Sequence, residues 1–252
     1  MRQYVLPSTF NGESQLKLKG KDSQYFIKVL RLKIGDKIFA RDVQGSPYQL
    51  TLLSYDKNSC LIEVNKLDQG ESFISTDELP TFSGKYPKLH LYQCVCKGKK
   101  NDTIIKMATE LGVHSITLIQ SKFCIAKKDN SNTKRYETII KEAIQQSGSP
   151  IITKFNKIVD FKNFVESLEF PLLFFHQIDL DNNNSLREKI KHLDLDTHVG
   201  ILIGPEGGLS DEECNLLLEK GGIPVMLKTN ILRAETAAIV GLSAIHTLMM
   251  EK

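Results

Sequence analysis

The chain contains 252 residues, of which 41% are hydrophobic and 25% are charged, and its formal net charge is +3. This is ordinary globular composition, and the length suits one large domain or two smaller ones. No run approaches the roughly 18 uninterrupted apolar residues of a membrane-spanning helix, and the N-terminus lacks the apolar core of a signal peptide. The composition therefore argues against a membrane protein and favours a soluble, cytoplasmic one.

Basic residues are concentrated in the first part of the chain. Residues 1–70 carry 11 Lys or Arg against 7 Asp or Glu, and residues 85–141 carry 12 against 4, whereas residues 142–252 carry 10 against 16. Clustered basic residues indicate a polyanionic partner such as a nucleic acid. A solvated lysine-rich face is the alternative that charge alone leaves open.

Residues 1–70 are predicted to form a small β-barrel. The segments QLKLKG, DKIFARD, YQLTLLSYD and CLIEVNKL are rich in β-formers and are separated by turn residues. Only DSQYFIKVLRL has the spacing of a helix. Residues 71–87 are polar, contain a glycine and two prolines, and are predicted to be a linker.

Residues 88–252 alternate between predicted strands and helices, which indicates a mostly parallel sheet covered by helices. The expected strands are KLHLYQCV, VHSITLIQ, FPLLFFHQ, THVGILIG and IPVMLK. The expected helices are NDTIIKMATELG with Asn101 as its cap, TKRYETIIKEAIQQSG, SDEECNLLLEKGG and AETAAIVGLSAIHTLMM. Ligands of such sheets bind beyond the carboxyl ends of the strands, which directs attention to residues 175–177, 203–205 and 227–229.

The loop GPEGGLSDEE follows one of these strand ends. Phosphate-binding loops leave a helix N-terminus open and usually add a lysine, but here Glu206 would repel phosphate, and Ser210 with Glu213 forms a predicted capping box. The loop therefore suits a ligand without phosphates, such as the sulfonium cofactor S-adenosylmethionine. A tight strand-to-helix turn without a ligand is the alternative.

The last helix is preceded by Arg233 and holds Glu235 in its first turn, where an acid suits the helix dipole. Ala237, Ala238, Gly241 and Ala244 place small side chains along one side. Glycine inside a helix costs about 0.5–1 kcal/mol relative to alanine, so Gly241 indicates that another group approaches closely.

No metal site is expected. The five cysteines (Cys60, Cys94, Cys96, Cys124 and Cys214) are scattered, and the close pair Cys94 and Cys96 has no second pair to complete a zinc site. They are predicted to be buried and reduced. The histidines are scattered too and form no metal or triad pattern, and His176 is interpreted as a loop residue beside a ligand.

Four motifs together resemble the RsmE family of bacterial 16S ribosomal RNA uracil-N3 methyltransferases, within the SPOUT superfamily. They are VLRLKIGD at 29–36, ATELGV at 108–113, IGPEGGLSDEE at 203–213 and ILRAETAA at 231–238. The resemblance covers nearly the whole chain. It implies a PUA-like RNA-binding barrel at 1–70 and a trefoil-knotted α/β methyltransferase domain at 88–252 with helices on both faces of a parallel sheet. It also implies a homodimer, and 16S ribosomal RNA or the small ribosomal subunit as partner.

The resemblance further implies that S-adenosylmethionine is held at the three strand ends, by Phe175, His176, Ile203, Gly204, Pro205, Gly207, Gly208, Leu227, Ile231, Leu232, Arg233 and Ala234. Arg233 is the candidate for stabilising charge on the target uracil, and Glu235 or Glu206 for orienting Arg233 or accepting a proton. The candidates for RNA contact are Arg2, Arg31, Lys97, Lys99, Lys100, Lys122 and Lys127.

The chain departs from the family pattern at Phe123, Ser149, Lys228 and Asn230, because the family commonly has arginine or glycine at or near these positions. These changes bear on RNA contact, which the neighbouring lysines can support only as point charges. Two other functions stay open at this stage, a knotted methyltransferase acting on tRNA and a noncatalytic RNA-binding assembly factor.

Overall fold

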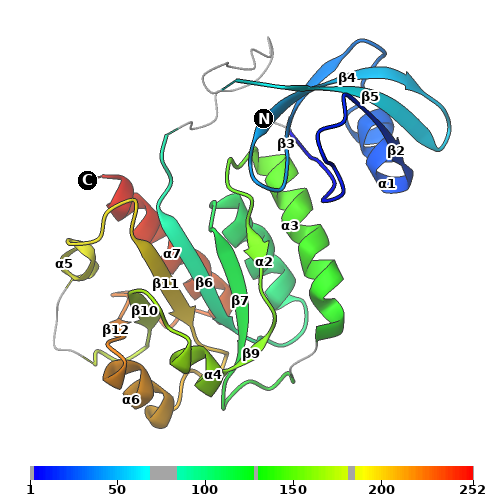
Figure 1. Ribbon diagram of the computed structural model, residues 1–252. Coiled ribbons are helices and arrows are strands. Elements are labelled where there is room, and N and C mark those ends of the chain that lie inside the picture. Colours follow the sequence, from blue (N-terminus) through cyan, green and yellow to red (C-terminus); the bar gives the residue numbers. More distant parts are fainter. Residues whose placement is uncertain (1–2, 69–83, 128–129, 181–184, 252) are drawn as a thin grey trace. The chain divides into compact units, whose positions relative to one another are not determined.

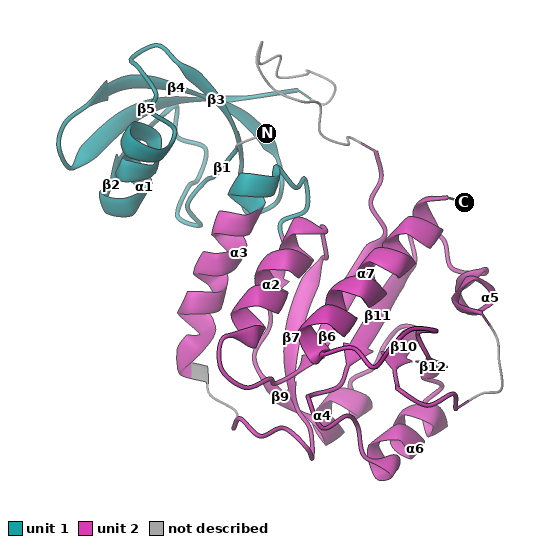
Figure 2. Cartoon of the chain, turned by 180° about the vertical axis from the view of Figure 1, so that it is seen from behind, with its two compact units in different colours: residues 1–82, 144–152 teal, residues 83–143, 153–252 magenta. Residues whose placement is uncertain are grey.

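The computed structural model describes residues 3–68, 84–127, 130–180 and 185–251 (Figure 1). The chain divides into two compact units, coloured separately in Figure 2. The first, here called the barrel unit, contains residues 1–82 and 144–152, and the second, here called the α/β unit, contains residues 83–143 and 153–252. Within the described ranges, no helix is both long enough and apolar enough to cross a membrane.

The barrel unit is built on a five-stranded sheet in the order β1-β3-β4-β5-β2. Four of its strands lie in the segments that the sequence predicts, and the two-residue β1 was missed. All neighbouring strands are antiparallel except β1 and β3. The interior is filled by large apolar side chains, among them Tyr4, Phe26, Leu50 and Ile62, each with no exposed surface. The strands are β1 (Tyr4–Val5), β2 (Gln15–Lys19), β3 (Lys37–Arg41), β4 (Pro47–Tyr55) and β5 (Ser59–Lys66).

The predicted helix of this unit is present but irregular. It begins as α1 (Gly20–Gln24) and continues as a π-helix, η1 (Tyr25–Val29). Phe26 anchors it in the core, where its ring meets Tyr4 edge to face at 4.9 Å between centroids. The sequence predicted the helix because its apolar residues share one side, but it did not predict the π-helical turn.

The segment 144–152 is far from the barrel in sequence but belongs to the same compact unit. The side chain of Gln3 is buried and donates hydrogen bonds to the carbonyls of Ile144 (3.1 Å) and Ser149 (2.7 Å). The backbone N–H of Gln3 also donates to the Gln145 carbonyl. These bonds satisfy an otherwise costly buried amide, and no local sequence signal pointed to them.

The α/β unit contains a seven-stranded sheet in which every described strand pair is parallel. Its main path is β12-β10-β11-β6-β7-β8, and β9 pairs with β7. The central strands β10 and β11 are buried on both faces, as their continuous apolar runs predicted. The strands are β6 (Lys88–Cys94), β7 (Ser115–Gln120), β8 (Lys154–Phe155), β9 (Val159–Asp160), β10 (Leu172–Phe175), β11 (His198–Ile203) and β12 (Ile223–Val225).

Helices cover both faces of this sheet (Figure 1). On one face α4 and α6 pack over Leu172, Phe174 and Leu202. On the other face α7 lies against β6 and β11, with α2 beside it. The helices are α2 (Lys100–Glu110), η2 (Asn130–Asn132), α3 (Thr133–Ser147), α4 (Phe161–Glu166), α5 (Leu186–Ile190), α6 (Asp211–Glu219) and α7 (Ala234–Met250).

The predicted cap at Asn101 is wrong. The N-cap of α2 is Lys99, which makes no side-chain cap bond, and Asn101 is buried inside the first turn. Its side chain accepts from the Cys96 N–H (3.0 Å) and donates to the Cys96 carbonyl (3.1 Å). Asn101 therefore fastens the chain leaving β6 instead of capping the helix. The short helices α4 and α5 were also missed, because neither is long enough to show a helical period.

Candidate functional site

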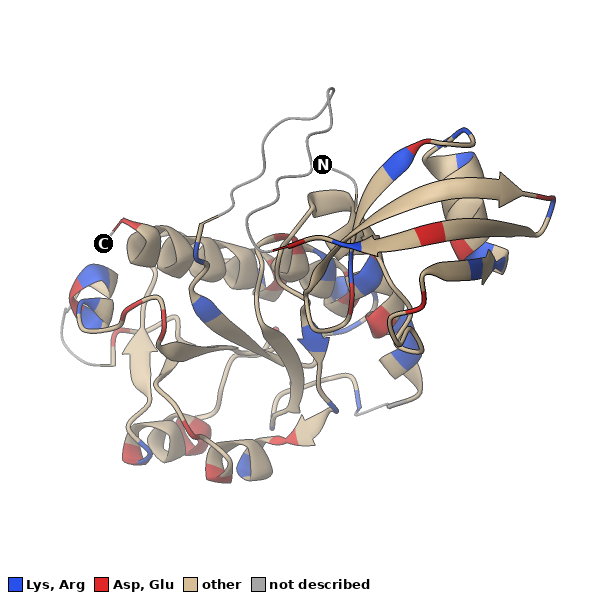
Figure 3. Ribbon diagram, turned by 45° about the horizontal axis from the view of Figure 1, so that its top comes forward, with Lys and Arg blue, Asp and Glu red and all other residues tan. Residues whose placement is uncertain are grey.

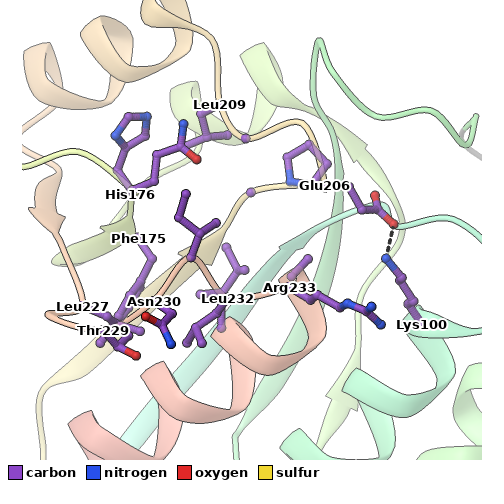
Figure 4. Close-up of a pocket in the computed structure, with 18 residues that line it drawn as sticks. Lys100, Phe175, His176, Glu206, Leu209, Leu227, Thr229, Asn230, Leu232 and Arg233 are labelled. Carbon is purple, nitrogen blue, oxygen red and sulfur yellow. Dashed lines mark hydrogen bonds and ion pairs between the residues drawn. The ribbon is translucent and has the colours of Figure 1, made fainter.

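A pocket of about 380 Å³ opens where β10, β11 and β12 end (Figure 4). The three loops that leave these strands form its walls, together with the start of α7 and one side chain from α2. The volume is that of a small-molecule site. The lining residues are Lys100, Phe175, His176, Gln177, Ile203, Gly204, Pro205, Glu206, Gly208, Leu209, Leu227, Thr229, Asn230, Ile231, Leu232, Arg233, Ala234 and Ala237.

The structure brings together almost all of the side chains that the sequence placed at a cofactor site. Eleven of the twelve candidates line this pocket, and Gly207 does not. Gly207 faces away, because a Cβ added there would lie 3.0 Å from the Cβ of Phe123. Gly207 thus allows the loop to contact its neighbour, whereas Gly204 and Gly208 border the pocket itself.

The glycine loop between β11 and α6 is held by its own hydrogen bonds. Gly208 has a φ of 74°, in the left-handed region that favours glycine, and its N–H donates to the Pro205 carbonyl (2.9 Å). The predicted capping box of α6 is confirmed. Ser210 Oγ accepts from the Glu213 N–H (3.3 Å), and Glu213 Oε2 accepts from the Ser210 N–H (2.9 Å). These side chains occupy the helix terminus, so it does not offer a phosphate site.

Glu206 lies at the rim of the pocket and is fixed by α2 and the turn before it. Its Oε1 accepts hydrogen bonds from the Lys97 N–H (3.1 Å) and from Lys100 Nζ (2.9 Å). Partial burial raises the pKa of this carboxyl, but the bond from Lys100 and the backbone N–H donors outweigh burial and lower it below its ordinary value. Glu206 is therefore an ionised brace of the glycine loop.

Lys100 joins a second carboxylate to the same network. Its Nζ lies 3.5 Å from Glu235 Oε2, in the first turn of α7. The hydrogen bond to Glu206 and the attraction of both acids raise the pKa of Lys100, although burial lowers it. One ammonium thus links the glycine loop, α2 and α7. The two acids that the sequence offered as partners of Arg233 pair with Lys100 instead.

Arg233 is the N-cap residue of α7 and lines the pocket with its side chain exposed. Among the described residues, no carboxylate lies within ion-pair distance of its guanidinium. Figure 4 shows it on the side of the pocket where Glu206 and Lys100 also lie. The described part of the site therefore combines apolar walls with one braced ion-pair network and one uncompensated cation.

Phe175 explains the glycine in the last helix. A Cβ added at Gly241 would lie 2.9 Å from Phe175 Cζ, so the ring packs directly on the α7 backbone. The expectation that Gly241 admits a close neighbour is confirmed, and that neighbour is a pocket residue of the same chain. Closer approach of the ring to the helix is possible because glycine has no side chain there.

Besides Glu206, six lining residues were not named as cofactor candidates, although two of them, Gln177 and Thr229, lie in the strand-end segments to which the sequence directed attention. Thr229 and Asn230 lie between the candidates Leu227 and Ile231, so the neighbouring positions could have indicated them. Lys100 had been assigned to RNA contact, and nothing local shows that it meets Glu206, which is 106 positions later. The remaining three are Gln177, Leu209 and Ala237.

The RNA-contact candidates come from several separate segments of the chain, and Figure 3 colours every described Lys and Arg position blue on the ribbon. Lys97, Lys99 and Lys127 are exposed. Lys122 is exposed but pairs with Glu212 at 2.8 Å. The remaining two candidates, Arg31 and Arg2, come from the first part of the chain. Arg31 is exposed in the barrel unit and has a φ of 57°, and Arg2 lies outside the described residues.

The cysteines are all free, and four of the five are buried, while Cys124 is partly exposed. In the described ranges, His, Cys, Asp and Glu side chains form no group that could hold a metal ion. The histidines are far apart in the sequence, but three of them come together in space. His90, His114 and His198 meet at the end of the sheet opposite the pocket.

Known proteins resemble the chain over nearly its full length. An RNA methyltransferase domain model matches residues 84–246, and an RNA methyltransferase PUA domain model matches residues 18–65. Ribosomal RNA small subunit methyltransferase E 2 of Borreliella burgdorferi is 29% identical, with 99% of this chain and 98% of that protein covered. Ribosomal RNA small subunit methyltransferase E of Aquifex aeolicus is 33% identical, with 70% and 76% covered.

The fold is also shared with a solved structure, a ribosomal RNA small subunit methyltransferase E from Neisseria gonorrhoeae bound to S-adenosyl methionine. It superposes with a TM-score of 0.79 at 22% identity, covering 98% of both chains. The fold, with its PUA-like sheet and its parallel α/β unit covered by helices on both faces, and the matched family model lead to the same assignment. The chain belongs to the RNA methyltransferase family that contains the ribosomal RNA small subunit methyltransferases E.

Proposed function

We propose that the protein transfers a methyl group from S-adenosylmethionine to N3 of a specific uridine in 16S ribosomal RNA. The observation that carries this proposal is the pocket at the carboxyl ends of β10, β11 and β12 in a chain of this family. The relatives' names supply the ribosomal RNA substrate, and the Neisseria gonorrhoeae structure holds the cofactor.

The pocket residues fit S-adenosylmethionine better than a nucleotide with phosphates. Glu206 lies at the rim, and the capping box closes the N-terminus of α6. The Glu206 carboxylate is paired with Lys100 and tolerates a sulfonium cation, and the capped N-terminus of α6 offers no free N–H groups to a phosphate. The apolar side chains of Phe175, Leu209 and Leu232 suit the adenosine, while the turn at Gly208 keeps backbone close to the ligand. The whole set of candidate cofactor residues except Gly207 would hold it.

When bound, S-adenosylmethionine supplies an electrophilic methyl group. The uridine N3 proton is only weakly acidic, so negative charge on the uracil must be stabilised as methylation proceeds. Arg233 is the residue we assign to this task, because its cation is uncompensated among the described residues while that of Lys100 is shared by two carboxylates. A preorganised cation in a site that excludes water typically supplies a few kcal/mol to such a step.

Glu235 is the acid we assign to proton acceptance. Its Oε2 makes no hydrogen bond among the described residues, although Lys100 Nζ lies 3.5 Å away. The contacting oxygen of Glu206, in contrast, already accepts two hydrogen bonds. Glu206 and Lys100 then act as positioning residues that hold the glycine loop against α2.

The assembly we propose around this site is a cytoplasmic homodimer that binds the small ribosomal subunit or its RNA. The barrel unit would supply RNA affinity, because it matches the PUA domain model. Exposed Lys97 and Lys99 precede α2 near the pocket residue Lys100, where phosphate attraction would direct RNA toward the site.

The test is incubation with S-adenosylmethionine labelled in its methyl group, with undermethylated small subunits, bare 16S ribosomal RNA and total tRNA in parallel. Nucleoside analysis should find labelled N3-methyluridine in one of the first two samples. Label in tRNA alone would replace the proposal with a tRNA methyltransferase. Calorimetry that finds no cofactor binding would instead indicate a noncatalytic RNA-binding factor.

A further inference from the structure

Two cysteines of the α/β unit lie in contact beside the pocket loops. Cys94 is the last residue of β6 and pairs in register with Ile119 of β7. The chain turns after β7 and returns Cys124 to the same place, with its Sγ 3.7 Å from the Ile119 carbonyl oxygen. Both thiols belong to one apolar cluster, in which each shifts the pKa of the other.

Cys124 has surroundings that stabilise a thiolate. The Ser121 N–H donates to its Sγ at 3.3 Å, and the Ser121 hydroxyl oxygen lies 3.3 Å from the same sulfur. With the bond from Cys94 as the largest cause, these donors outweigh burial and lower the pKa of Cys124 to about 6. Burial has the opposite effect on the other thiols, raising the pKa of Cys94 well above its ordinary value, that of Cys96 to about 12 and that of Cys214 to about 11.

The two cysteines also differ in their exposure to solvent. Cys124 is partly exposed, whereas Cys94 has no exposed surface. An accessible thiolate next to a second thiol is the arrangement of peroxide-sensitive cysteines, in which one sulfur reacts with the oxidant and the other resolves the product.

We propose that Cys124 and Cys94 are a peroxide-oxidised thiol pair, in which Cys124 reacts first and Cys94 resolves it to an intramolecular disulfide. The Cys124 thiolate attacks one oxygen of a hydroperoxide, the O–O bond breaks, and the alkoxide or hydroxide that leaves takes up a proton. The resulting sulfenic acid is attacked by Cys94 sulfur, which forms the S–S bond and releases water. A thiol or dithiol reductant reverses the oxidation.

Oxidation of the pair would affect the pocket through the turn that carries Cys124. The Lys122 N–H of this turn donates to Glu213 Oε1 at 2.8 Å, and Phe123 abuts Gly207. Drawing Cys124 from hydrogen-bond contact to covalent distance must shift this turn, and with it the glycine loop. This part of the inference rests on the proposed function and predicts weaker S-adenosylmethionine binding in the oxidised protein.

The experiment treats the full-length protein with graded hydrogen peroxide near pH 7, then alkylates the remaining thiols and maps them by mass spectrometry. We expect loss of two hydrogen atoms, a Cys94–Cys124 cross-linked peptide and full reversal by dithiothreitol. The initial rate should rise through pH 6 and level off as Cys124 becomes thiolate. Oxidation of Cys124 no faster than of Cys60 or Cys214 would overturn the proposal, as would a flat pH profile.

Three variants test the roles of the two cysteines, so that the conclusion does not depend on the correct folding of any single variant. Cys124→Ser should abolish the fast reaction, and Cys94→Ala should leave a sulfenic acid on Cys124 that dimedone traps. Cys60→Ser, in the barrel unit, is the matched control and should oxidise like wild type. If Cys94→Ala unfolds, dimedone competition against the disulfide in wild-type protein decides the order of attack. A disulfide that forms with unchanged cofactor affinity would retain the modification site but overturn its link to the pocket.

Discussion

The two ends of the parallel sheet carry titratable groups in opposite arrangements. At the carboxyl ends of the strands, Glu206, Lys100 and Glu235 form a charged network beside an open pocket. At the amino ends, His90 and His198 stack at 5.0 Å between ring centroids, with His90 Nε2 2.8 Å from His198 Nδ1. His114 and the Phe170 ring adjoin them.

The difference lies in the charge state that each environment favours. At the pocket, opposite charges and N–H donors favour ionised groups, so the pKa of Glu206 is lowered and that of Lys100 raised. At the histidine end, burial and the neighbouring imidazoles favour the neutral form, and the pKa of His90 falls to about 4. Polar groups at one end are thus arranged for a ligand and at the other for packing, which gives predictions that separate binding and catalysis from stability.

The largest expected effect is at Arg233. Replacing it with alanine should lower single-turnover methyl transfer by roughly 10²-fold or more, because one preorganised electrostatic partner is removed. S-adenosylmethionine affinity should change much less, since the interaction matters mainly in the transition state. Arg233→Lys should recover little if a planar contact is required. Lys228→Ala, which removes a nearby cation outside the pocket lining, is the control, and a normal rate in Arg233→Ala would exclude the assigned role.

Lys100→Met should weaken cofactor binding by roughly tenfold, as expected when a charge-assisted hydrogen bond is removed. Glu206 and Glu235 would then face each other without their shared cation, and the glycine loop would lose its attachment to α2. Lys106→Met is matched to it, because Lys106 lies on the same helix but is mostly exposed. Isothermal titration decides the case, and equal affinity in both variants would show that the network does not hold the pocket.

Gly241→Ala should lower the free energy of unfolding by up to about 2.5 kcal/mol, because the new methyl overpacks against Phe175 at a cost of about 1–3 kcal/mol while alanine regains only about 0.5–1 kcal/mol of helix propensity. Cofactor affinity should fall too, since Phe175 lines the pocket. Val240→Ala on the same helix is partly exposed and should change stability by only about 0.5 kcal/mol. Urea denaturation compares the two, and a stability increase of about 0.5–1 kcal/mol in Gly241→Ala would mean that the ring moves aside without cost.

The histidine end should make stability depend on pH. The folded pKa of His90 is lowered from 6.5 to about 4, so the unfolded chain binds the proton more readily in this window. The stabilisation is complete above pH 6.5 and is lost as pH falls toward 4. His90→Gln should reduce this slope, whereas His192→Gln, at an exposed position, should not. Denaturation midpoints between pH 7 and 4 measure it, and identical slopes in wild type and His90→Gln would contradict the burial argument.

The smallest effect concerns RNA affinity. Changing Lys97 and Lys99 to alanine should reduce the slope of log K against log salt by about 0.7–0.9 for each phosphate that the variant no longer neutralises. Lys85 and Lys88, at the amino end of β6, are the matched pair and should leave the slope unchanged if RNA binds only at the pocket end. Slopes equal to that of the wild type in both double variants would show that these four lysines contact only solvent.

The sequence alone determined four of the five barrel strands, the alternating α/β order, the capping box and most of the pocket. These features follow from periodicity, glycine and cap residues that are close together in the chain, and from four family motifs in order. The implied trefoil knot does not follow from the residues themselves, because general topology rules make knots very improbable.

The tertiary structure decided which charges meet. Lys100 and Glu206 are 106 positions apart, and no local pattern shows that one ammonium serves both Glu206 and Glu235 while Arg233 pairs with no described carboxylate. The same holds for Cys94 beside Cys124 and for His90 on His198. Each contact is created by the order in which parallel strands pair, since that order brings the ends of distant segments to one edge of the sheet.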